Sequence, residues 1–194
     1  MSNSNQCFTT VNTACSIIPP LEVWPFIYSE HSPERVLDYD NNRAMWPAHI
    51  NVTYPFVAQA GFTAAKTKLK QVFKENSISS FDIELSDFDI FEHTHTSIIF
   101  MRPRVIGDSR GDDLLKLIHD LIVTAFNIKE NHEYEPHLSV AYVKTEEVLK
   151  RKKRLEEKLL QPIRFTVDKL HFLATSKENG KMYSKCEIML DSNV

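Results

Sequence analysis

The sequence has few cysteines, no long apolar run and no leading signal, and each absence excludes a class of protein. Cys7, Cys15 and Cys186 show no CxxC spacing, which argues against a disulfide framework and a thiolate zinc site. No stretch approaches about 18 consecutive apolar residues, so no membrane span is expected. The first residues are polar and do not resemble a secretory signal. We therefore expect a cytoplasmic protein with reduced thiols, or a nuclear one.

The sequence also lacks an excess of basic residues. Its formal net charge is -3 and its isoelectric point is about 6.2. Proteins that hold long duplex DNA through its phosphates usually carry a basic surface. The charge therefore argues against duplex DNA as a partner and favours a small substrate or one end of a strand.

The composition is that of a chain with a folded core. The 194 residues are 42% hydrophobic and 10% aromatic, which is enough for one domain. Residues 1–14 are rich in Ser, Asn and Thr and are predicted to form a disordered tail. Residues 15–194 are predicted to form a single domain.

The spacing of apolar residues predicts an alternation of strands and helices. Thr145 is predicted to cap a helix, and Asn179-Gly180 to form the turn of the last hairpin. The order indicates an α+β fold with two similar lobes. Strands are predicted over 16–18, 49–54, 81–91, 97–101, 137–143, 163–174 and 181–190, and helices over 21–37, 62–73, 114–125 and 146–159.

A repeated motif is the strongest feature of the sequence. Segments 49–54 (HINVTY) and 137–142 (HLSVAY) share His, Val and Tyr at the same offsets, with a small polar residue at the third position. The copies begin 88 residues apart (137 − 49). On a strand, the His and the polar residue two places later point to the same face. Two such strands side by side would present two imidazoles to one cavity.

This set of side chains suits the breaking of a phosphodiester bond. One group must take a proton from the attacking oxygen and another must protonate the leaving oxygen. Histidine titrates near neutral pH, so His49 and His137 could hold both roles. Asn51 and Ser139 could donate hydrogen bonds to the non-bridging oxygens. The scheme requires neither a metal ion nor a cofactor.

These motifs resemble those of the 2H phosphoesterases, the superfamily of RNA ligase-like and cyclic phosphodiesterase-like proteins. Its signature is two copies of His-x-Thr/Ser-x, with x usually apolar. Segment 137–140 matches fully, whereas segment 49–52 has Asn51 in place of the usual hydroxyl residue. Segments 17–25 and 46–56 look like a eukaryotic and fungal branch in which Asn is common at this position. The resemblance covers roughly residues 15 to 190.

The resemblance implies a fold and an activity. The fold would be bilobal, with two pseudo-symmetric lobes, each with an antiparallel sheet lining a central cleft and with helices outside. The activity would be cofactor-free and metal-independent, on 2′,3′-cyclic phosphates, 2′–5′ linkages or related nucleotide and RNA-end substrates. We expect a monomer that binds a nucleotide or RNA end.

The resemblance also implies a role for Tyr142. In plant members of the superfamily, a Tyr five residues after the second histidine lies near the phosphate, and Tyr142 occupies that position. Regular alternation would place Tyr142 on the opposite face from His137, so this role requires a twist or a bulge in the strand.

Other interpretations remain open. The cleft could bind a nucleotide or RNA end without cleaving it, and Asn51 is the residue that favours this. Segment 95–98 (HTSI) also fits His-x-Ser-x, but it lies in a predicted hairpin turn and no Tyr follows it. His93 and His95 could ligate zinc, although the spacing offers no convincing third ligand. The basic run 150–154 could bind RNA or form a solvated helix face.

Overall fold

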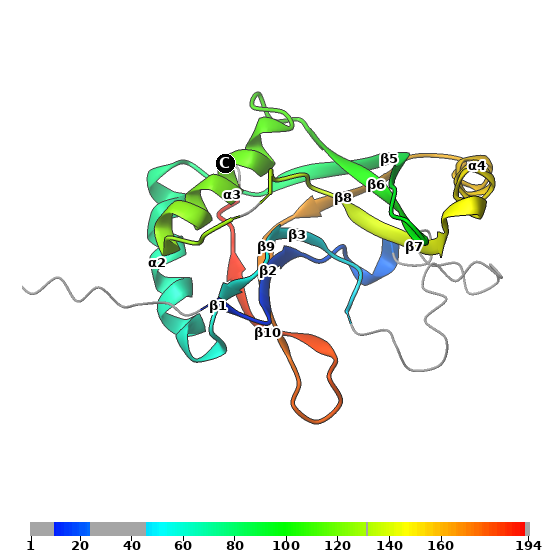
Figure 1. The fold of residues 1–194 in the computed structure, drawn as a ribbon. Coiled ribbons are helices and arrows are strands. Elements are labelled where there is room, and N and C mark those ends of the chain that lie inside the picture. Colours follow the sequence, from blue (N-terminus) through cyan, green and yellow to red (C-terminus); the bar gives the residue numbers. More distant parts are fainter. Residues whose placement is uncertain (1–9, 24–45, 131, 193–194) are drawn as a thin grey trace, which may run out of the picture.

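The computed structural model describes residues 10–23, 46–130 and 132–192 (Figure 1). Its strands are β1 (Thr10–Val11), β2 (Thr13–Ile17), β3 (Ile50–Thr53), β4 (Phe56–Val57), β5 (Phe81–Phe91), β6 (Thr96–Ile106), β7 (Leu138–Lys144), β8 (Ile163–Val167), β9 (Lys169–Thr175) and β10 (Met182–Met189). Its α-helices are α2 (Phe62–Glu75), α3 (Asp113–Phe126) and α4 (Val148–Lys158). Short 3-10 helices are η1 (Leu21–Val23), η2 (Gln59–Gly61) and η3 (Thr145–Glu147).

Eight of the strands form one sheet in the order β10-β9-β2-β3-β7-β6-β5-β8. Every neighbouring pair in it is antiparallel. The sheet curls strongly (Figure 1), and β1 pairs with β4 beside it. At its centre, β3 and β7 are joined through a single residue pair, Ile50 and Leu138. The two motif strands are therefore direct neighbours.

The prediction of an α+β fold is confirmed, but the arrangement of its strands differs from the two sheets that we expected. The pairing of Ile50 with Leu138 makes the strands of both halves part of one sheet. The joint between the two groups of strands is only one residue pair long. A pseudo-symmetric pair of lobes is not confirmed.

The N-terminal predictions also need correction. Strands β1 and β2 begin at Thr10 and Thr13, before the predicted start of the domain at residue 15. Thr13 is buried, and its hydroxyl donates to the carbonyl of Val57 at 2.9 Å, which ties this segment to the domain. Of the predicted helix over 21–37, the structure describes only η1, and residues 24–37 lie outside the described residues.

Three element boundaries differ for local reasons. Strand β6 continues past Met101 through Pro103, since beyond Met101 its described pairing is with β5 alone and a strand with an open edge tolerates proline. The predicted strand over 163–174 is divided at Asp168 into β8 and β9. Thr145 does not cap α4, because its hydroxyl donates to the carbonyl of His93 and lies 3.0 Å from the hydroxyl of Ser97.

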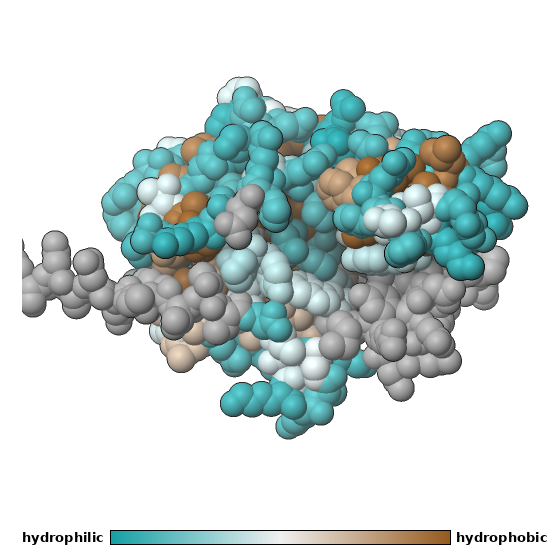
Figure 2. Space-filling model, viewed as in Figure 1, coloured by the Kyte–Doolittle hydropathy of each residue, from teal (hydrophilic) through white to brown (hydrophobic). Residues whose placement is uncertain are grey.

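The other predicted elements are present. Helices α2 and α3 match the predicted apolar stripes, and β9 and β10 form the hairpin whose turn contains Gly180 at a φ of 70°. All three α-helices contribute to one continuous hydrophobic core against the sheet. Viewed from the same side, the surface is mostly hydrophilic and is hollowed near its centre (Figure 2).

An aromatic cluster fixes β4 between the helices and the sheet. The ring of Phe56 lies 4.9 Å from that of Phe172 on β9 and 5.4 Å from that of Phe126 on α3. Phe56 and Phe172 are fully buried. Because Phe56 follows the first motif directly, this packing holds the end of the motif strand against the core.

We predict that Phe56→Ala lowers the free energy of unfolding by about 3–5 kcal/mol, because it leaves a cavity in this cluster. Chemical denaturation would measure the change. Leu160→Ala is the control, since Leu160 is 92% exposed and its truncation should change stability by at most about 0.5 kcal/mol. Equal effects of the two substitutions would contradict the packing described.

Candidate active site

The register of the central strand pair brings the two motifs together. Ile50 lies opposite Leu138, and both side chains are fully buried. Side chains alternate along a strand, so the residues on either side of this pair point to the opposite, cleft-facing side. Continuing this antiparallel register by one residue in each direction would set His49 opposite Ser139 and Asn51 opposite His137. The pairing of Ile50 with Leu138 thus makes the two motif strands direct neighbours.

Both histidine rings are held in the same way. His49 Nδ1 lies 2.8 Å from the carbonyl oxygen of Pro47, and His137 Nδ1 lies 2.8 Å from that of Glu135. A carbonyl oxygen only accepts hydrogen bonds, so each Nδ1–H donates. In the neutral form, each ring is then left with an unprotonated Nε2. The two rings therefore share one tautomer and offer the same nitrogen for proton transfer.

Aromatic side chains flank each imidazole differently. The ring of His49 stacks on Trp46, with centroids 4.8 Å apart and an interplanar angle of 25°. His137 meets Phe91 and Phe100 edge to face, at 4.9 and 5.6 Å. Trp46 therefore packs on the first histidine, which limits the rotation of that ring. The Phe pair limits the rotation of His137.

Burial and charge both act on His49. Desolvation lowers the pKa of His49 below its usual value, and the nearby His137 lowers this pKa further. The hydrogen bond to Pro47 acts in the opposite direction and only partly offsets them. The proton on His49 is therefore held less tightly than on a free imidazole. The electrostatic effect of His137 also indicates that the two imidazoles are close enough to influence one another.

Asn51 is held by two hydrogen bonds from other segments. The hydroxyl of Ser16 on β2 donates to Asn51 Oδ1 at 2.8 Å. The hydroxyl of Tyr134 donates to the Asn51 carbonyl at 3.3 Å. Burial raises the pKa of Tyr134 above its usual value, so this hydroxyl stays protonated as a donor. Both the side chain and the backbone of Asn51 are thus fixed.

Both motif strands contain a bulge at the same motif position. The register shifts so that Val52 is extra in β3 relative to β2, and Val140 is extra in β7 relative to β6. Each valine is the fourth residue of its motif. On β6, Phe100 and Ile98 lie two residues apart on one face, opposite Ser139 and Tyr142 respectively. The bulge therefore turns Tyr142 to the face that carries Ser139, as its predicted role requires.

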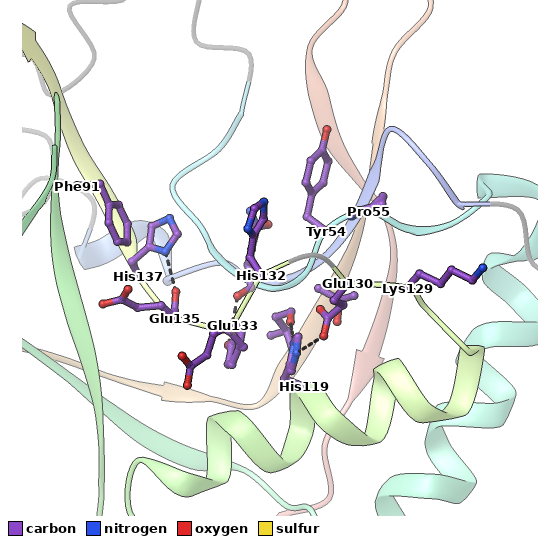
Figure 3. Close-up of a pocket in the computed structure, with 14 residues that line it drawn as sticks. Tyr54, Pro55, Phe91, His119, Lys129, Glu130, His132, Glu133, Glu135 and His137 are labelled. Atoms are coloured by element: carbon purple, nitrogen blue, oxygen red, sulfur yellow. Dashed lines mark hydrogen bonds and ion pairs between the residues drawn. The ribbon is translucent and has the colours of Figure 1, made fainter. Parts of the chain in front are cut away.

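A cavity of about 390 Å³ extends from His137 along β3 (Figure 3). His137 and Phe91 lie at one end and Lys129 at the other (Figure 3). His49, Ser139 and Tyr142 are not part of its wall. The lining residues are Asn51, Val52, Thr53, Tyr54, Pro55, Phe91, His119, Lys129, Glu130, His132, Glu133, Tyr134, Glu135 and His137.

Sequence reasoning missed His119 on α3, which forms part of the wall of this cavity. Its Nδ1 lies 2.6 Å from the carbonyl oxygen of Val52, and its Nε2 lies 2.9 Å from Glu130 Oε2. Its ring stacks on Tyr134 at 4.0 Å. The His119 ring hydrogen-bonds the carbonyl of Val52, and the Tyr134 hydroxyl hydrogen-bonds that of Asn51. These two β3 carbonyls therefore have partners although β3 and β7 are paired only at Ile50 and Leu138. A polar residue on the apolar stripe of the predicted helix was the signal that could have pointed to it.

A charged network anchors the segment before His137. Arg102 Nη2 lies 2.9 Å from Asp89 and 2.9 Å from Glu135. Glu135 is also the residue whose carbonyl orients His137. These side chains are partly exposed, so the ion pairs contribute little to overall stability. Their geometric effect is to tie the His137 segment to the β5-β6 hairpin.

The competing sequence candidates lie elsewhere. Ser97 is fully buried, with its hydroxyl beside that of Thr145, so the 95–98 segment does not join the cleft. His93 and His95 are exposed, and no described residue completes with them a group of three His, Cys, Asp or Glu that could hold a metal ion. The basic run lies on α4, where Lys152 pairs with Glu156. None of the described helices is long and apolar enough to cross a membrane.

Comparison with known proteins places these features in a family. The family model of the 2'-5' RNA ligase superfamily matches residues 19–179. Because the match spans more than half of the chain, the chain belongs to this superfamily. Members of the superfamily are phosphodiesterases.

Solved structures show the same fold at low identity. E. coli LigT complexed with 3'-AMP gives a TM-score of 0.56 at 13% identity, covering 94% of this chain and 99% of that chain. E. coli LigT complexed with phosphate gives 0.54 at 13% identity, covering 94% and 99%. Kluyveromyces marxianus Usb1 gives only 0.45, at 13% identity, covering 92% and 97%. No curated protein matches the chain.

We predict that His137→Gln raises the pKa of His49. The substitution removes a positive charge that disfavours protonation of His49, while leaving its desolvation in place. Titration of the His49 ring signals by NMR would measure the pKa. His132→Gln is the matched control, because His132 is not among the groups that act on His49. An unchanged or lowered pKa in His137→Gln would contradict the proximity of the two imidazoles.

Proposed function

We propose that this protein is a metal-independent phosphodiesterase in which His49 and His137 act as a general acid-base pair. The observation that carries the proposal is the common tautomer of the two rings. Each donates its Nδ1–H to a carbonyl two residues earlier and is left with Nε2 for proton transfer. Each histidine directly precedes one member of the Ile50–Leu138 pair, which supports the proposal that one phosphate reaches both rings.

The lowered pKa of His49 supports its role as the base in hydrolysis. Neutral His49 takes a proton from water as the water oxygen attacks phosphorus. His137, in its protonated form, donates a proton to the departing ribose oxygen. One P–O bond forms, one breaks, and the proton gained by His49 balances the proton lost by His137. In the reverse direction, the two histidines exchange roles.

Three further side chains are proposed to bind the phosphate. The Asn51 amide and the Ser139 hydroxyl can each donate to a non-bridging oxygen, where negative charge grows in the transition state. Tyr142 follows the bulge at Val140 and lies on the face that carries Ser139. Tyr142 is 45% exposed, which suits contact with a substrate more than core packing.

The proposed substrates are 2′,3′-cyclic phosphates, 2′–5′ linkages and related nucleotide or RNA-end phosphodiesters. Membership of the 2'-5' RNA ligase superfamily supports this class. The likeness of the fold to E. coli LigT, which has been solved with 3'-AMP and with phosphate, is consistent with it. The cavity of about 390 Å³ beside His137 is of a size that suits a nucleotide.

Several narrower statements belong to the same proposal. Asn51 in the first motif favours a eukaryotic or fungal branch of the superfamily. A single domain that includes strands β1 and β2, a monomeric state and a cytoplasmic or nuclear location fit the composition. Duplex DNA is not a proposed partner, because the net charge of -3 offers no basic footprint.

The test is a screen of 2′,3′-cyclic nucleotides, ADP-ribose cyclic phosphate and 2′–5′ oligonucleotides. His49→Ala and His137→Ala should each lower kcat/KM by about 10²- to 10⁴-fold, since each removes one proton-transfer group. Turnover by the wild type should have a bell-shaped pH profile and resist chelators. His93→Ala, which alters an exposed turn histidine, is the matched control and should keep wild-type activity. Intact turnover in both active-site variants would refute the assignment.

The alternative is a module that binds a nucleotide or RNA end without cleaving it. Asn51 is the feature that favours this, since it replaces the hydroxyl residue usual in the motif. Under this alternative, calorimetry would detect binding of 3'-AMP while the whole screen of substrates stayed uncleaved. Cleavage of any substrate that depends on both histidines would exclude it.

A further inference from the structure

We infer that Ser16 is a positioning residue that turns the amide of Asn51 so that its NH₂ group faces the phosphate. The inference rests on the proposed function and deepens it, because it explains how a site can work with Asn where a hydroxyl residue is usual. It also assigns a purpose to a buried polar residue that the mechanism does not otherwise use.

The geometry begins with the register of β2 and β3. Ser16 is the cross-strand partner of Asn51, so their side chains lie on the same face of the sheet. The Ser16 hydroxyl lies 2.8 Å from Asn51 Oδ1. Ser16 is fully buried, whereas Asn51 is only partly buried. The hydrogen bond therefore connects the buried Ser16 hydroxyl to the Asn51 side chain in the wall of the cavity.

Burial determines which end of the amide turns inward. A buried hydroxyl proton needs an acceptor, and leaving it without one costs about 1–3 kcal/mol. Within the described part of the chain, the hydroxyl of Ser16 makes one hydrogen bond, to Asn51 Oδ1. If the amide were flipped, Nδ2 would face Ser16, and the hydroxyl proton would lose this acceptor. The structure therefore favours the orientation with Oδ1 inward and Nδ2 toward the cleft.

The orientation matters because the two ends of an amide have opposite effects on a phosphate. Nδ2–H donates to a non-bridging oxygen and stabilises the charge that grows there. Oδ1 in the same place would repel that oxygen. A serine or threonine hydroxyl can rotate to present its proton, so it needs no such partner. The hydroxyl of Ser139 in the second motif can rotate in this way.

The backbone of Asn51 is fixed independently of Ser16. The Tyr134 hydroxyl donates to the Asn51 carbonyl, and the bulge at Val52 follows directly. Removing the Ser16 hydroxyl should therefore free the amide to flip without moving the strand. This separation allows the positioning role to be tested without disturbing the fold.

The test is a cycle of four proteins: wild type, Ser16→Ala, Asn51→Thr and the double variant. In the wild-type background, Ser16→Ala should lower kcat by about tenfold, because the Asn51 amide no longer holds its Nδ2–H toward the phosphate. In the Asn51→Thr background, the same substitution should change kcat by less than about twofold, since a hydroxyl orients itself. The pH profile should stay unchanged throughout, as both histidines are intact.

Two results would overturn the inference. One is wild-type activity in Ser16→Ala. The other is an equal loss in both backgrounds, which would indicate a purely structural role for Ser16. If Ser16→Ala fails to fold, Ser16→Cys provides the same test, because a thiol of similar size is only a weak donor.

A measurement without substrate separates this inference from the proposed function. In ¹⁵N-labelled wild-type protein, the Asn51 side-chain amide should be rigid in its heteronuclear NOE, and in Ser16→Ala it should become mobile. If no substrate is cleaved but this change occurs, the proposed function fails and the positioning role stands. If cleavage occurs and the Asn51 amide is equally rigid in Ser16→Ala, the positioning role fails alone.

Discussion

The pairing of Ile50 with Leu138 is the constraint on which the site depends. Each of these residues follows a histidine, and both point into the core, so their alignment turns the neighbouring histidines out to the same side. A slip of the register by one residue would move each imidazole to the other face of its strand. The hydrophobic core therefore determines the geometry of the polar site: the burial of two aliphatic side chains places the two imidazoles.

The two motif strands hold their histidines in the same way, but the surroundings of the two imidazoles differ. Both contain a valine bulge and a histidine held by a carbonyl two residues earlier. His49, however, is stacked on Trp46 and partly desolvated, whereas His137 lies against Phe91 at the end of an open cavity. Different surroundings give chemically identical groups different proton affinities. Desolvation and the neighbouring imidazole, which lower the pKa of His49, favour His49 as the base of the proposed mechanism.

The sequence predicted the local features better than the long-range ones. The alternation around His49 and His137 gave the right strands, and the apolar stripes gave α2 and α3, because these patterns depend on neighbouring residues. The single sheet was not predictable, since no local pattern encodes the one-residue joint between β3 and β7. Nor were the contacts of Ser16 and His119 with β3, which link residues 35 and 67 positions apart.

In the proposed mechanism, both imidazoles exchange protons with oxygens of one phosphorus centre. A crystal structure of the protein with vanadate and a nucleoside, which together mimic the transition state, would test it most directly. We expect the vanadium between the two rings, with one vanadate oxygen within about 3 Å of Nε2 of His49 and another within about 3 Å of Nε2 of His137. Vanadate bound by only one of these nitrogens, or bound at the Lys129 end of the cavity, would contradict it.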